Sequence, residues 1–91
     1  MNKRLSLIIS GKVQGVLFRA YVFEKANLLG LTGWVRNNPN GTMEILAEGE
    51  ERKLLSLMEF CKHGPLAAEV KEVKFEWDNY KKEFKKFNVQ H

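Results

Sequence analysis

In residues 5–30, LSLIISGKVQGVLFRAYVFEKANLLG, the spacing of apolar residues changes from that of a strand to that of a helix. This change determines the first two elements of the fold. Over residues 5–10 the side chains alternate in the period of a strand, and they are apolar enough on both faces for a central one. Residues 11–18 then form a loop with two glycines. From Arg19 onward apolar residues return at helical spacing, which predicts a helix that Gly30 ends.

The middle of the chain predicts a β-hairpin and then a second helix. Strands over 31–37 and 42–49 flank Asn38-Pro39-Asn40-Gly41, whose Asn, Pro and Gly suit the first, second and fourth positions of a type I turn. A stripe of apolar residues at i, i+3, i+4 and i+7 follows, and Gly64-Pro65 ends it. The stripe consists of Leu54, Leu57, Met58 and Cys61.

The C-terminal part adds strands and completes the predicted order. Apolar and charged residues alternate over 72–77, which predicts a fourth strand, and a charged connector over 81–86 leads to Phe87 and Val89, which could form a short fifth. The order β-α-β-β-α-β is that of two interleaved β-α-β units with right-handed crossovers. We therefore predict an α+β, ferredoxin-like (split β-α-β) sandwich, with an antiparallel sheet of four to five strands and two helices on one face.

Length and composition limit the class of protein. The 91 residues have the size of one domain, so we expect a single domain over residues 1–91. No apolar run approaches the roughly 20 residues of a membrane span, and the N-terminus lacks the apolar core of a signal peptide, so we expect a cytoplasmic protein. We also expect a monomer. The one cysteine, Cys61, excludes an internal disulfide and a multi-cysteine metal site.

The charge of the chain is uneven. The net charge is +4, yet residues 1–36 alone carry +5. A positive field favours an anionic partner, which includes nucleic acid, a phosphate ester or an anionic lipid. In the predicted topology the first two strands are parallel with the third between them, so their C-terminal ends lie at the same edge of the sheet. The loop over 11–19 and the pair Arg36-Asn37 therefore come close together.

The loop before the first helix has features of an anion site. It runs into a helix N-terminus, where backbone N–H groups lack intrahelical partners. Gly15 can adopt a positive φ that lets consecutive amides converge, and Arg19 can offer a bidentate fork to a phosphate or carboxylate. Without a longer motif, Arg19 also fits a solvated residue at a helix start, and Asn37 also fits the beginning of a turn.

Two longer motifs are more specific than these loop features. Residues 11–19, GKVQGVLFR, resemble the G-x-V-Q-G-V-x-F-R signature of the acylphosphatases. Gly33-Trp34-Val35-Arg36-Asn37, with Gly41 and Gly49 at fitting spacing, resembles the second signature of that family, although Met43 stands where the family usually has valine. The resemblance implies hydrolysis of a small-molecule acyl phosphate to a carboxylate and inorganic phosphate. It implies no metal and no other cofactor, and neither nucleic acid nor a membrane as partner.

The resemblance also implies roles for individual residues. Arg19 matches the phosphate-binding arginine of the family, and Asn37 matches the asparagine that positions the attacking water. The sparse set is chemically reasonable, because a carboxylate leaving group with a pKa of about 4 needs no general acid. Positioning and charge stabilisation then give most of the help. The phosphate cradle is matched by the backbone amides of Gln14, Gly15, Val16, Leu17 and Phe18.

Two alternative functions are also considered for this fold. An RNA-binding module of this fold would stack bases on aromatic residues of the central strands. The strands over 5–10 and 42–49 have no aromatic residue, which disfavours this function. A carrier or regulatory domain would bind an acyl phosphate without turning it over, and only a kinetic assay separates it from an enzyme.

Overall fold

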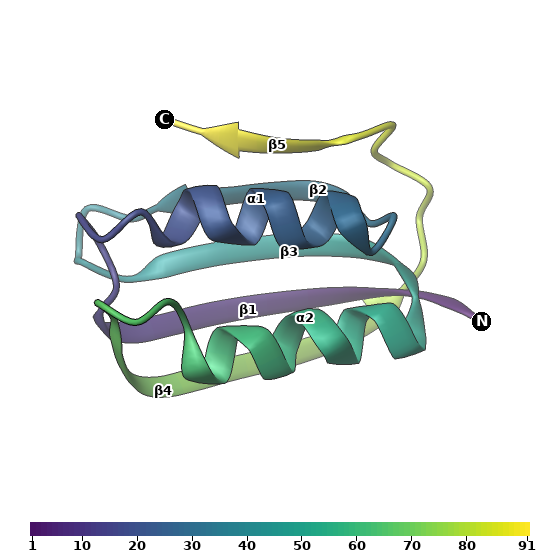
Figure 1. Cartoon of the computed structure of the whole chain (residues 1–91). Coiled ribbons are helices and arrows are strands. Elements are labelled where there is room, and N and C mark those ends of the chain that lie inside the picture. The colour runs from purple at the N-terminus through teal and green to yellow at the C-terminus, as the bar shows by residue number, and fades with distance from the viewer.

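The computed structural model describes all residues 1–91 and has seven elements in the order β-α-β-β-α-β-β (Figure 1). Both helices lie on one face of the sheet, as predicted (Figure 1). Neither is long and apolar enough to cross a membrane. The elements are β1 (Asn2–Lys12), α1 (Phe18–Leu28), β2 (Thr32–Asn37), β3 (Met43–Glu50), α2 (Glu51–His63), β4 (Glu69–Asn79) and β5 (Phe87–Gln90).

The sheet has the strand order β4-β1-β3-β2-β5. The α+β, ferredoxin-like prediction is confirmed in its layers and its order, but the expectation of a wholly antiparallel sheet was wrong at one strand. β5 pairs with β2 in parallel, so the sheet is mixed. β4 ends at the end of the sheet where β2 begins, and the connector after β4 crosses that end to the other edge, so β5 starts beside the start of β2 (Figure 1). The tip of β5 consequently lies beside the tip of β2.

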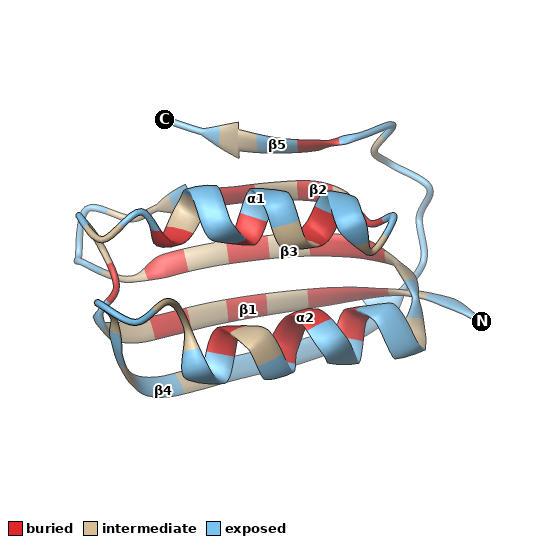
Figure 2. Cartoon of the chain, in the orientation of Figure 1, coloured by how far each residue is buried: buried red, intermediate tan, exposed pale blue.

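The core lies between the sheet and the two helices, where the buried residues gather in Figure 2. The period of two in β1 and β3 turns every second side chain toward the helices, and Leu5, Leu7, Ile9, Met43, Ile45 and Ala47 are all fully buried there. The predicted stripe of α2 packs onto them and includes Cys61. Burial raises the pKa of the Cys61 thiol to about 12, so this cysteine is an inert core residue.

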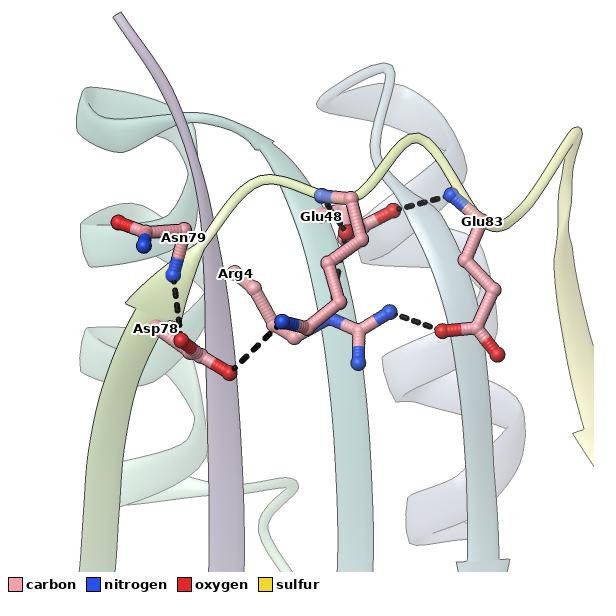
Figure 3. Close-up of polar contacts among 6 residues, drawn as sticks. Arg4, Glu48, Asp78, Asn79 and Glu83 are labelled. Atoms are coloured by element: carbon pink, nitrogen blue, oxygen red, sulfur yellow. Dashed lines mark hydrogen bonds and ion pairs between the residues drawn. The ribbon is translucent and has the colours of Figure 1, made fainter.

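On the opposite face, a buried ion pair fastens the connector to the sheet (Figure 3). Arg4 of β1 and Glu48 of β3 are register partners, and Arg4 Nε donates to Glu48 Oε2 at 3.2 Å. The same carboxylate accepts from the backbone N–H of Lys81 at 2.7 Å and of Glu83 at 3.0 Å. Arg4 also pairs with the Glu83 carboxylate and lies over the ring of Phe84. These contacts set where β5 begins.

The Glu48 carboxylate is held in its charged form. Burial by itself would raise its pKa, but the two amide hydrogen bonds and the Arg4 guanidinium outweigh burial and lower the pKa below the ordinary 4.5. A carboxyl group with a lowered pKa in the folded state stabilises the fold above its unfolded pKa. That stabilisation is lost as the pH falls through the lowered value.

We predict that Glu48→Ala lowers the free energy of unfolding by about 3–5 kcal/mol, because it removes the buried partner of the Arg4 guanidinium and leaves the amides of Lys81 and Glu83 without their acceptor. Urea denaturation measures the loss. Glu44→Ala is the matched control: Glu44 lies on the same face of β3 and pairs with Arg36 at 2.9 Å in a more exposed position. The control should cost less than about 1 kcal/mol. Equal losses in the two variants would contradict a special role for Glu48.

The difference in stability between the native chain and Glu48→Gln should depend on pH. The difference should have its largest value above about pH 5 and should shrink as the pH falls below 4.5, the ordinary pKa of the Glu48 carboxyl group. Urea midpoints between pH 3 and pH 7 test this. A difference that stays constant down to about pH 3 would show that the Glu48 charge does not stabilise the fold.

Candidate active site

Three segments meet at one end of the sheet: the loop between β1 and α1, the end of β2, and the end of β5 (Figure 1). They enclose an open cavity of about 370 Å³, which is the size of a small-molecule site. The prediction that loop 11–19 and Asn37 come together is confirmed by this shared cavity. Its lining residues are Val13, Gly15, Leu17, Phe18, Arg19, Ala20, Asn37, Val89 and His91.

The backbone of the loop is shaped for an anion. Gly15 has a φ of 73° and Leu17 a φ of 62°, so two left-handed residues flank Val16. The amides of residues 14–17 donate no hydrogen bond to the rest of the backbone. The first turn of α1 adds further N–H groups that cannot bond within the helix. Converging, unpaired amides of this kind form a concave anion-binding nest.

Two buried side chains hold this loop at its ends. Val13 and Phe18 are each 1% exposed, whereas Leu17 between them is 72% exposed. The Phe18 ring packs edge-on against Phe60 of α2, with 6.3 Å between centroids. A leucine in the left-handed region is unfavourable by about 1 kcal/mol. Leu17 adopts it because the chain must turn there to bring Phe18 into the core.

Arg19 projects from the first turn of α1 into the cavity wall. Its Nη1 makes two long contacts, at 3.4 Å to the carbonyl oxygen of Gln90 and 3.5 Å to His91 Nδ1. The other three arginines of the chain all pair with carboxylates, and Arg19 pairs with none. Its guanidinium therefore keeps both its positive charge and most of its N–H donors for a ligand.

Asn37 is the last residue of β2, and its side chain lines the same cavity. Its Oδ1 is buried and has no hydrogen-bond partner. It is the one buried side-chain nitrogen or oxygen atom of the chain without a partner. A buried carbonyl oxygen without a donor is unfavourable by about 1–3 kcal/mol and calls for an explanation. A water molecule or a ligand group that donates a hydrogen bond would satisfy it.

A short network joins the loop to the β2–β3 turn. Gln14 Nε2 donates to the carbonyl oxygens of Asn38 at 2.9 Å and Thr42 at 3.0 Å. The predicted turn is confirmed, because the N–H of Gly41 donates to the carbonyl oxygen of Asn38 at 3.1 Å. The Gln14 side chain thus fixes the distance between the nest and the strand end that carries Asn37.

The sequence did not place the end of β5 at this cavity, and so missed Val89 and His91. The alternation of Phe87 and Val89 indicated a strand, but nothing local indicated its partner. Arg36, next to Asn37 in the chain, is exposed, pairs with Glu44 and lies 4.6 Å from the ring centroid of Trp34. No group of three or more His, Cys, Asp or Glu residues could hold a metal ion.

The comparisons with known proteins agree with this fold and the two motifs. The acylphosphatase family model matches residues 5–89. An acylphosphatase from Marinobacter nauticus is 50% identical over 88 residues, covering 97% of this chain and 96% of that protein. One from Pelotomaculum thermopropionicum is 44% identical over 86 residues, covering 94% of each. The crystal structure of acylphosphatase from Bacillus subtilis matches 100% of both chains with a TM-score of 0.94 and 34% identity.

These findings fix the class first, a ferredoxin-like α+β sandwich, and then the family within it. The chain belongs to the acylphosphatase family.

We predict that Gln14→Met lowers the free energy of unfolding by about 1–2 kcal/mol, because two hydrogen bonds from the loop to the hairpin are lost while the volume is nearly kept. Urea denaturation is the measurement. Asn88→Met, at an exposed position of β5 without a side-chain hydrogen bond, is the control. The stabilising role of Gln14 would be refuted by equal midpoints for the two variants.

Proposed function

We propose that this chain, acting as a single domain and a monomer, hydrolyses acyl phosphates without a metal ion. In this proposal Arg19 and the amides of Gln14 to Phe18 bind the phosphoryl group, and Asn37 positions the attacking water. One observation carries it: Asn37, whose buried Oδ1 has no hydrogen-bond partner, lines the same cavity as Arg19, whose guanidinium pairs with no carboxylate. The names of the related proteins support the reaction class.

The proposed binding step follows from charge. A phosphoryl group has several negatively charged oxygens, and the nest supplies N–H donors on one side while Arg19 supplies a cation on the other. Both are fixed before the substrate arrives, because Val13 and Phe18 anchor the loop. Fixed donors stabilise the charge that spreads over the phosphoryl oxygens in the transition state, and they need no reorganisation to do so.

In the proposed chemical step the water oxygen forms a bond to phosphorus while the bond between phosphorus and the acyl oxygen breaks. Asn37 Oδ1 accepts a hydrogen bond from the water and so orients its lone pair toward phosphorus. Asparagine is no base at neutral pH, so the proton of the water passes to a phosphoryl oxygen. The electron pair of the broken bond leaves with the carboxylate, which needs no proton because its pKa is about 4.

Two variants test the roles separately. Arg19→Ala should lower kcat/KM for acetyl phosphate by about a thousandfold or more and weaken inhibition by inorganic phosphate, because a charged donor to the phosphoryl group is lost. Asn37→Ala should lower kcat by about a hundredfold or more and leave the inhibition constant of phosphate within about threefold, because only the water loses its acceptor.

Arg36→Ala is the matched control, because Arg36 is exposed and already paired with Glu44. It should keep nearly full activity. Full activity in Arg19→Ala would refute its role, and activity that disappears with a chelator would refute metal-independence. Phosphate binding without any turnover of acetyl phosphate would instead support a carrier domain.

A further inference from the structure

The cavity has two chemically different sides. Gly15, Arg19 and Asn37 form the polar side, which the proposed function assigns to the phosphoryl group and the water. A phosphoryl group alone is much smaller than the cavity volume of about 370 Å³. The remaining lining consists of His91 and of an apolar wall made by Val13, Leu17, Phe18, Ala20 and Val89.

A second hollow continues from this wall along α1. Ala20 lines both hollows, so the two lie next to each other at this residue. Positions three and four apart share a helix face, and the second hollow follows such a row from Ala20 through Phe23 to Asn27, with Glu24 and Leu28 beside it. The path leads along α1, away from the loop between β1 and α1.

The apolar residues on this path do not belong to the hydrophobic core. Phe23 is 39% exposed, and Leu28 is 77% exposed. Together with the exposed Leu17 at the mouth of the cavity, they form an apolar track next to a polar site. Exposed apolar groups that adjoin a concave site are typical of ligand binding.

We propose that this track binds the acyl part of the substrate, and that the preferred substrates are acyl phosphates with an apolar chain or ring extending from the phosphoryl cavity past Ala20 to Phe23. This inference rests on the proposed function. Glu24 beside the track disfavours acyl groups that carry a second negative charge. The substrate class is therefore the phosphate of an apolar monocarboxylic acid.

The size of the preference follows from partial burial. Complete burial of a methylene is worth about 0.8 kcal/mol, or about a fourfold change in affinity. The track is open to solvent on one side, so half of that is expected, which is about a twofold gain for each methylene. Because the contact is the same in the ground state and the transition state, the gain enters through KM and leaves kcat unchanged.

The test compares acetyl, butyryl and hexanoyl phosphate. We expect kcat/KM to be about tenfold or more higher for hexanoyl than for acetyl phosphate, through a lower KM. In Phe23→Ala this ratio should fall to about threefold or less, and Phe23→Leu should restore most of it. Tyr21→Ala is the matched control: Tyr21 is an exposed aromatic of the same helix, lines neither hollow, and should leave the ratio unchanged.

The outcomes separate the two proposals. Hydrolysis of all three substrates with equal kcat/KM would overturn the acyl track and leave the proposed function standing. A high ratio that Phe23→Ala does not lower, or that Tyr21→Ala lowers equally, would also overturn the track. Failure to hydrolyse any of the three would overturn the proposed function itself.

Discussion

The burial of Val13 and Phe18 at the two ends of one loop is the constraint on which the site depends. Both side chains are almost completely buried, and the residues between them are four. Across this short segment the backbone turns back toward the core, and Gly15 and Leu17 adopt positive φ values there. The same turn that packs Phe18 against Phe60 therefore converges the amides into a nest.

The contacts of Glu48, at the other end of the sheet, also help to position the cavity. Glu48 holds the connector through the N–H groups of Lys81 and Glu83, and the connector leads directly into β5 (Figure 3). β5 then runs parallel to β2 and ends at Arg19, whose Nη1 contacts the carbonyl oxygen of Gln90. A buried charge far from the cavity thus decides where one wall of the cavity stands, although it contacts none of the residues proposed to act on the substrate.

Much of this could be predicted from the sequence, and the limits have physical causes. Local periodicity was sufficient for β1, α2 and the turn at Asn38, because each is decided by its own residues. The two motifs were sufficient for the family. The parallel pairing of β5 was out of reach, because it depends on contacts between Glu48 and residues more than thirty positions away. The proposed roles of Arg19 and Asn37 stay predictions, although the cavity brings the two residues together.

The distribution of charge connects the stability of the fold with the choice of ligand. The positive excess of residues 1–36 suggested an anionic partner, and the predicted topology placed its site where the loop ending at Arg19 meets the strand ending at Asn37. Arg4 and Arg36 form ion pairs with carboxylates, whereas Arg19 faces a cavity with no acidic residue in its lining. Because Arg4 and Arg36 are neutralised by carboxylates, they do not compete with Arg19 for an anionic ligand. The positive field is therefore concentrated at the cavity. The proposed acyl track adds an apolar region beside this positive charge, and the two together match an acyl phosphate with an apolar acyl group.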